Sequence, residues 1–216
     1  MLLNVQPISP NTFMILYYIH DPMCSWCWGF KPVLKDLESR LSDNIQIEYI
    51  LGGLAADNDT PMSEDMKLQI QAAWKRIEET IPGTQFNYDF WKNCIPKRST
   101  YLSCRAVIAA RKQCDSKSFE MITAIQEAYY LKALNPSDLS VLKKLAADIG
   151  LNVDMFSKDI VSPDINKSFE DEISFSRKIG ADSFPSLYLY VDKNYYPIVI
   201  DYNHSDVIID HLNSFK

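Results

Sequence analysis

The 216-residue sequence has no excess of basic charge and no long apolar run. It carries 22 Lys and Arg against 28 Asp and Glu, which gives a net charge of −6. An acidic chain without a basic stripe cannot displace counterions from phosphates, and anionic lipid would repel it. We therefore expect neither nucleic acid nor a membrane surface as a partner. The apolar run Phe13–Ile19 is far shorter than the ~20 residues that a membrane-spanning helix needs.

Histidine and glycine are also scarce, with three and six residues respectively. A structural zinc site needs four ligands, usually two cysteine pairs or one pair with closely spaced histidines. The sequence holds a single C-x-x-C pair, and His20, His204 and His211 do not complete a ligand set at zinc spacing. Gly52-Gly53 alone makes no phosphate-binding loop. We expect no metal and no resident cofactor.

The cysteine count, five, is odd, which argues against a disulfide framework. The N-terminal sequence MLLNVQPISPNTF has no basic segment and its apolar residues are interrupted, so it does not resemble a secretory signal peptide. We therefore expect a cytoplasmic protein with reduced thiols. Cys104 shares an apolar helical face with its neighbours and is expected to be a buried structural thiol, whereas Cys94 and Cys114 are expected at or near the surface.

The first fifty residues have the pattern of a strand, a helix and a second strand. An apolar run at Met14–Ile19 and an alternating run at Ile45–Leu51 enclose a segment of helical spacing that follows Cys27. Two strands joined by a helix predict a parallel pair with a crossover connection. From about Pro61 to Lys178, nearly every segment has helical period.

Strand patterns return near the end of the chain. Leu187–Val191 and Tyr196–Ile200 flank the spacer Asp192-Lys193-Asn194 and predict a hairpin. Ser205 is expected to cap a last helix. Because strands from both ends must share one sheet, the helical block is interpreted as an insertion. The prediction is an α/β domain, an all-helical insertion domain and an N-terminal arm, with the ranges 12–58 plus 181–216, 59–180 and 1–11.

Local signals predict several helix ends within the helical block. Asn135-Pro136 is interpreted as an N-cap followed by proline at the first helical position, and Gly150 as the residue that ends that helix. Ser162-Pro163 repeats the start signal, and Gly180 is expected to stop the helix that follows.

The stretch DPMCSWCWGF, from Asp21 to Phe30, places two cysteines between the first strand and the first helix. Cys24 is expected at the helix start, where unpaired backbone N–H groups stabilise an anion. Cys27 follows one turn later, close enough to attack a mixed disulfide formed at Cys24. A C-x-x-C within a β–α–β pattern is typical of a thioredoxin-like redox site, which favours a reactive dithiol over a zinc clip or a structural bridge.

Two prolines support this interpretation. Pro32 lies within the predicted helix, where a kink is expected. Pro185 directly precedes the Leu187–Val191 strand and suits a tight turn with a cis peptide bond. Opposite the dithiol, it would leave the backbone of Phe184 free to pair with a bound peptide.

These motifs resemble those of the DsbA family, in which a helical domain interrupts a thioredoxin fold, and in particular its FrnE-like subgroup of protein-disulfide isomerases. The resemblance rests on three segments: Asp21–Phe30, Pro96–Ala106 with its Pro-Lys-Arg-Ser-Thr and Cys-Arg-Ala motifs, and Phe184-Pro185-Ser186.

The resemblance implies that Cys24 is the nucleophile, Cys27 the resolving thiol and Pro185 a cis-proline facing them. Substrate proteins or small disulfides and thiols are then the expected partners, and glutathione is a candidate redox partner. The expected substrate contacts are Ser25, Trp26 and Phe184.

One departure concerns the two residues between the cysteines. The periplasmic oxidases of the family carry Pro-His, whereas this chain has Ser25-Trp26. Without that histidine, a Cys24 thiolate is less stabilised and the couple less oxidising, which favours an isomerase or reductase. A related group, similar to kappa-class glutathione transferases and 2-hydroxychromene-2-carboxylate isomerases, has serine in place of Cys24. A glutathione-dependent enzyme of that type is the alternative hypothesis, and a binding module with an inactive dithiol is the third.

Two other features have both a functional and a structural interpretation. Lys97, Arg98 and Arg105 form a basic cluster, which could hold a thiolate or a glutathione carboxylate or could be a solvated surface patch. His20 ends the first strand and could tune Cys24 electrostatically, but a hydrogen-bonded or solvated histidine is the favoured interpretation.

Overall fold

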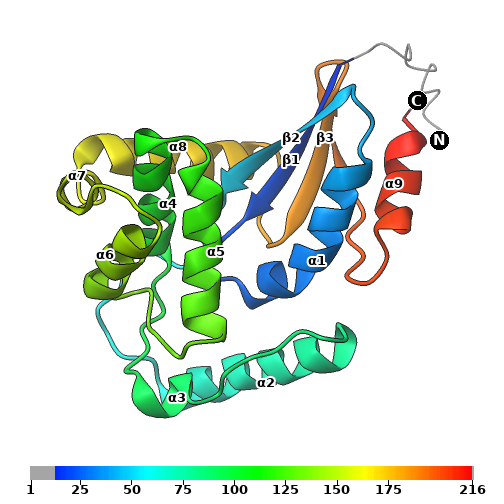
Figure 1. Ribbon diagram of the computed structural model, residues 1–216. Helices are drawn as coiled ribbons and strands as arrows, with labels where there is room; N and C mark the ends of the chain where they lie inside the picture. Colours follow the sequence, from blue (N-terminus) through cyan, green and yellow to red (C-terminus); the bar gives the residue numbers. More distant parts are fainter. Residues whose placement is uncertain (1–12, 216) are drawn as a thin grey trace.

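The computed structural model describes residues 13–215, and the expected N-terminal arm, 1–11, lies outside them. A four-stranded sheet with the order β2-β1-β3-β4 lies among the helices, with most of the helical block to its left and below it in Figure 1. β1 and β2 run parallel, and β3 is antiparallel to both β1 and β4. The prediction that the two ends of the chain share one sheet is confirmed. The strands are β1 Met14–His20, β2 Ile45–Leu51, β3 Ser186–Val191 and β4 Asn194–Ile198.

Helices cover both faces of the sheet. Helix α1 (Ser25–Arg40) and helix α9 (Ser205–Asn213) lie on one face, where their apolar side chains join alternate residues of β1 and β3 in a single core. Helix α8 (Pro163–Lys178) packs along the other face, and its Phe175 ring lies 4.9 Å from that of Tyr17 on β1. The period-2 alternation of β1 therefore divides its side chains between two layers.

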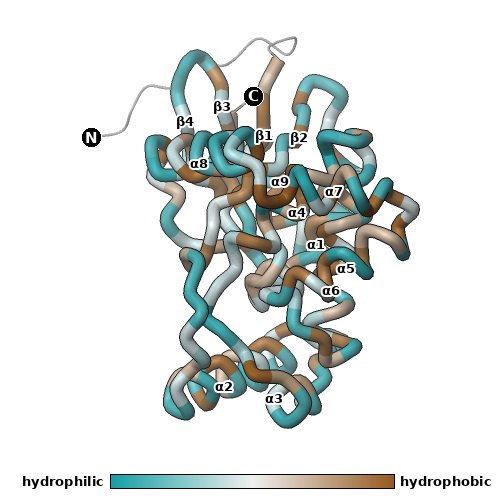
Figure 2. The backbone as a smooth tube through the Cα atoms, turned by 90° about the vertical axis from the view of Figure 1, so that its left-hand side faces the viewer, coloured by the Kyte–Doolittle hydropathy of each residue, from teal (hydrophilic) through white to brown (hydrophobic). Residues whose placement is uncertain are grey.

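Six further helices follow β2 and precede α8. A second apolar core, centred on fully buried residues such as Trp74 and Tyr130, joins them to one edge of the sheet. Figure 2 shows α2 and α3 at the opposite end of the molecule from the β3–β4 turn. The helices are α2 Glu64–Thr80, α3 Phe90–Asn93, α4 Tyr101–Gln113, α5 Lys117–Tyr130, α6 Leu139–Asp148 and α7 Val153–Asp159.

Three of the predicted helix signals are confirmed. The Ser162 hydroxyl accepts a hydrogen bond of 3.3 Å from the backbone N–H of Ile165, and Pro163 begins α8. Gly150 and Gly180 follow the ends of α6 and α8 with φ of +77° and +86°, a conformation that glycine adopts without a steric penalty.

Two predicted helix starts were wrong. The helix expected after Asn135 begins at Leu139, because the Asn135 side chain accepts from Ser137 N–H and donates to the Asp138 carboxylate, which stabilises a turn instead. Ser205 does not cap α9 but is its first residue, and its hydroxyl donates to Asp36 on α1.

The last hairpin is tighter than expected. Asp192 and Lys193 both have positive φ, 50° and 64°, and form a two-residue turn. Val191 therefore pairs with Asn194, and β4 begins two residues before the predicted Tyr196. Left-handed residues at both turn positions match the twist of the flanking strands.

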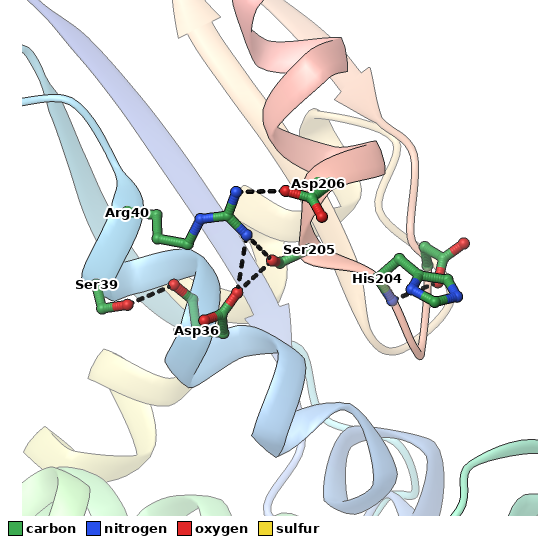
Figure 3. Close-up of polar contacts among 7 residues, drawn as sticks. Asp36, Ser39, Arg40, His204, Ser205 and Asp206 are labelled. Carbon is green, nitrogen blue, oxygen red and sulfur yellow. Dashed lines mark hydrogen bonds and ion pairs between the residues drawn. The ribbon is translucent and has the colours of Figure 1, made fainter.

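A polar cluster joins the C-terminal end of α1 to the first turn of α9 (Figure 3). Arg40 donates to Asp36 at 3.1 Å and to Ser205 at 2.8 Å, and it forms an ion pair with Asp206. Arg40, Asp36 and Asp206 are all exposed to solvent, where water and salt screen their charges, so these ion pairs contribute little to stability. The position of α9 therefore depends mainly on its apolar face.

Candidate active site

The dithiol lies where β1 passes into α1, as predicted. Cys24 is the N-cap of α1; its N–H donates to Asp21 O at 3.0 Å, and its carbonyl accepts from Trp28 N at 3.0 Å. Both cysteines are free thiols. Cys24 is 5 % exposed and Cys27 only 1 %, so a substrate sulfur must displace neighbouring groups to reach the first and cannot reach the second.

The predicted segment Phe184-Pro185 meets the dithiol. The Phe184–Pro185 peptide bond is cis, and Cys24 Sγ lies 3.4 Å from the Phe184 carbonyl oxygen, although 160 positions separate the two residues. Gly52, directly after β2, makes room for Phe184: a Cβ on Gly52 would lie 1.9 Å from Cε1 of that ring. Four predicted site residues, Cys24, Cys27, Phe184 and Pro185, are thus brought together.

Cys27 lies one helical turn into α1, in buried surroundings that disfavour a charged sulfur. Burial, a hydrogen bond with Cys24 and the nearby Cys24 charge raise the pKa of the Cys27 thiol well above its ordinary value, against an opposing backbone hydrogen bond from Asp21. The Tyr18 hydroxyl also hydrogen-bonds with the Cys27 side chain. At neutral pH, Cys27 is therefore a protonated thiol.

Aromatic rings flank the dithiol on both sides. The Trp26 ring lies 4.9 Å from that of Tyr202, and Trp28 stacks on Tyr130 at 5.6 Å. Trp26, Tyr202 and Trp28 are half-buried, as is Ser25. Burial and then the charges of Cys27 and Cys24 raise the pKa of Tyr202, which identifies it as a neighbour of both sulfurs. Tyr130 and Tyr202 carry no signal of this role in the sequence, because only the fold brings them here.

Asp21 was also missed, and it is the main polar link between the dithiol loop and the helices. Its fully buried carboxylate accepts from Met23 N–H at 2.8 Å, Leu54 N–H at 2.7 Å, Thr100 Oγ1 at 2.6 Å and Cys104 Sγ at 3.4 Å. Burial raises the pKa of Asp21, and these four hydrogen bonds oppose that shift. The only local signal was an acidic residue directly before a proline turn.

The remaining thiols lie as predicted. Cys104 is buried, Cys94 half-buried and Cys114 exposed. In the basic cluster, Lys97 pairs with Asp59 at 3.1 Å and Arg105 forms two hydrogen bonds, of 2.8 and 3.1 Å, with Asp57. Among the residues described, the lining of the neighbouring cavity of about 220 Å³ includes neither Cys24 nor Cys27, which favours the surface interpretation of this cluster.

His20 differs from its favoured interpretation. It is 1 % exposed, its ring is stacked 5.0 Å from Tyr18, and it meets the ring of Tyr49 edge-on at 5.5 Å. Its Nε2 atom has no hydrogen-bond partner among residues 13–215. Burial, with a smaller effect of Arg111, lowers the pKa of His20 to about 3. The imidazole is therefore neutral at pH 7, and it is neither solvated nor fully hydrogen-bonded.

The described residues contain neither a metal-binding cluster nor a membrane-spanning helix. Between residues 13 and 215, three or more His, Cys, Asp and Glu side chains are nowhere arranged to hold a metal ion. In the same part of the chain, no helix combines the length and the apolar character needed to cross a bilayer.

Solved structures with the same fold come from several bacteria. A candidate protein disulfide isomerase from Nitrosomonas europaea superposes with a TM-score of 0.81 and 28 % identity, over 94 % of this chain and 97 % of that one. The cytosolic disulfide reductase DsbM of Pseudomonas aeruginosa gives a TM-score of 0.73 at 22 % identity, over 93 % and 97 % of the two chains. The second likeness concerns the fold alone.

Curated relatives carry a different description. The ClpXP adapter protein SpxH of Halalkalibacterium halodurans is 25 % identical over 181 residues, and that of Bacillus subtilis is 24 % identical over 180. These alignments cover 82 % of this chain but only 58 % of the relatives, so the chain matches little more than half of their length.

A family model described as thioredoxin matches residues 17–205, a span that runs from within β1 to the first residue of α9. The match takes in the whole helical insertion and nearly all of the sheet, in agreement with the DsbA-like neighbours. The chain therefore belongs to this thioredoxin family and has the predicted α/β, DsbA-like architecture with a helical insertion.

Proposed function

We propose that the protein is a thiol–disulfide oxidoreductase of the reductase or isomerase type, with Cys24 as nucleophile and Cys27 as resolving thiol. The observation that carries the proposal is the position of Cys24. Its sulfur lies at the start of α1, 3.4 Å from the carbonyl oxygen of the residue before cis Pro185, with Cys27 buried one turn further on.

In the proposed cycle, the Cys24 thiolate attacks one sulfur of a substrate disulfide, and the other sulfur leaves as a thiolate. Cys24 is the N-cap of α1, and a helix N-terminus is a favourable place for negative charge to develop. Cys27 then loses its proton and attacks Cys24 Sγ, so that the bond to the substrate breaks and a Cys24–Cys27 disulfide forms. External thiols, of which glutathione is one candidate, return the protein to the dithiol form.

The surroundings of Cys24 favour reduction or isomerisation over strong oxidation. Ser25-Trp26 provides no imidazole to stabilise the Cys24 thiolate, so the reduced form has less advantage over the disulfide. The half-buried Trp26 and Tyr202 rings offer an apolar surface beside the sulfur on which a substrate chain can pack. A cytoplasmic location, where such an enzyme would keep thiols reduced, is part of the proposal.

The test is insulin reduction and refolding of a scrambled disulfide substrate by three cysteine variants. Cys24→Ser should abolish both activities, and Cys27→Ala should accumulate a mixed disulfide with substrate that intact-mass spectrometry detects. Cys114→Ser is the matched control, because this exposed thiol lies outside the site and its loss should change neither activity. Full activity of Cys24→Ser would refute the proposal.

Two other functions are separable by experiment. The SpxH relatives favour an adapter role, in which the fold binds another protein and the dithiol is dispensable. A Cys24→Ser/Cys27→Ser double variant would then still bind its partner protein. DsbM has also been solved with GSH, which favours testing glutathione. Turnover of a small aromatic substrate with glutathione by Cys27→Ser would support the glutathione-dependent isomerase or transferase.

A further inference from the structure

A small cavity of about 80 Å³ lies next to Cys27, between β1, α1 and α5. Much of its wall is apolar, but several polar groups from all three elements also reach it. The polar side chains that line it, besides Cys27 itself, are Tyr18, His20, Lys31, Tyr49, Thr123 and Gln126. Tyr49 lies on β2, and its hydroxyl donates to Glu38.

Two of these side chains carry an unpaired atom. Neither His20 Nε2 nor Gln126 Oε1 has a hydrogen-bond partner within residues 13–215, although the two residues are only 1 % and 4 % exposed. Leaving a buried polar atom unpaired costs about 1–3 kcal/mol, which ordered water with two to four partners can offset. One water needs roughly 10–15 Å³ of such a cavity, so this one can hold more than one.

The resolving step creates a need for such water. Cys27 must give up its proton before it attacks Cys24 Sγ, yet it is buried and burial raises the pKa of its thiol. Once a substrate is bound to Cys24, that side of the dithiol is covered. The carboxylate nearest in sequence, Asp21, already accepts four hydrogen bonds.

Resting on the proposed oxidoreductase function, we propose that this cavity is the route by which Cys27 exchanges its proton with solvent, through water held by His20 and Gln126. The Cys27 S–H bond breaks, and its proton passes to water next to the Tyr18 hydroxyl. The sulfur forms a bond to Cys24 Sγ as the bond from Cys24 to the substrate breaks. The substrate leaves as a thiolate and takes a proton from bulk solvent, so no net proton is consumed.

The far end of the route lies at Lys31 and Thr123. Lys31 Nζ donates to Thr123 Oγ1 at 3.1 Å, and each residue also lines an open groove on the molecular surface. Lys31 is half-buried, and burial lowers the pKa of its ammonium group, so it releases a proton to solvent more readily than a free lysine. The pair therefore connects the buried cavity to solvent.

The test separates attack by Cys24 from resolution by Cys27. A reduced protein with Cys94 and Cys114 replaced by serine is mixed with an excess of 5,5′-dithiobis(2-nitrobenzoate). The first thionitrobenzoate released reports attack by Cys24, and the second reports resolution. His20→Phe and Gln126→Leu, which remove the polar atoms but keep the size, should slow the second release about tenfold or more, in keeping with lost proton transfer.

Controls make each outcome decisive. The first release should stay unchanged in both variants, and His204→Phe, on the exposed turn before α9, should change neither phase. Circular dichroism reports folding, and Gln126→Leu decides if His20→Phe does not fold. A second phase within about twofold of the parent in the folded variants would overturn the inference. Loss of the first phase from the parent protein would instead count against the proposed function.

Discussion

Acidification should destabilise this protein through one imidazole, that of His20. Burial lowers its pKa from 6.5 to about 3 in the folded state. Below pH 6.5 the His20 imidazole binds a proton in the unfolded chain but stays neutral in the folded chain. The contribution of His20 to stability is therefore present above pH 6.5 and is lost as the pH falls toward 3. At about 1.36 kcal/mol per pH unit, the loss between pH 7 and pH 4.5 is about 2.5 kcal/mol.

The assay is urea unfolding of the parent, His20→Phe and His204→Phe at both pH values. Phenylalanine fits the same position between Tyr18 and Tyr49 and does not titrate, so His20→Phe should lose about 2.5 kcal/mol less than the parent. His204→Phe should follow the parent. Carboxylates that lose stabilising contacts in acid do so in all three proteins and cancel from the comparison. Equal losses in parent and His20→Phe would refute the reasoning.

Two further predictions concern the support of the dithiol. Asp21→Ala leaves the buried Met23 N–H and the half-buried Leu54 N–H without an acceptor and should cost about 3–5 kcal/mol of unfolding free energy in urea titrations. Asp43→Ala, at an exposed position, should change that free energy by less than about 0.5 kcal/mol. Gly52→Ala should displace the Phe184 ring, which its Cβ would approach to 1.9 Å, and slow insulin reduction several-fold. Gly83→Ala meets nothing within 4 Å but strains the backbone at a φ of +88°, so it should lower stability without slowing insulin reduction. An equal loss of activity in both glycine variants would contradict the steric argument.

The parts of the fold that the sequence predicted are those with a local cause. The apolar runs that became β1 and β2, and the Ser162-Pro163 start of α8, each depend on residues within a few positions. Local competition also explains the errors. Asn135 prefers a turn that its own side chain completes, and Lys193 adopts positive φ in a turn for which its identity gives no signal.

The parts of the site that sequence reasoning missed depend on long-range contacts. The Asp21 carboxylate meets groups 33, 79 and 83 positions away, and no pattern around Asp21 identifies them. The surroundings of the unpaired His20 Nε2 atom include residues of α5 as well as β1, which line one cavity together. In contrast, the contact between Cys24 and Phe184 was foreseeable, because C-x-x-C and a proline before a strand each carry their own chemistry.

The burial of Cys27 has two consequences that act on the same step. In the proposed cycle, an inaccessible thiol cannot itself attack a substrate disulfide, so the order of events, Cys24 first and Cys27 second, follows from geometry. The same burial disfavours the thiolate, so in the proposed cycle deprotonation of Cys27 would set the lifetime of the mixed disulfide. A short lifetime releases the substrate reduced, whereas a long one allows another thiol of the substrate to attack and yields an isomerised product. Substitutions in the cavity should therefore shift the ratio of reduction to isomerisation without changing how fast Cys24 reacts.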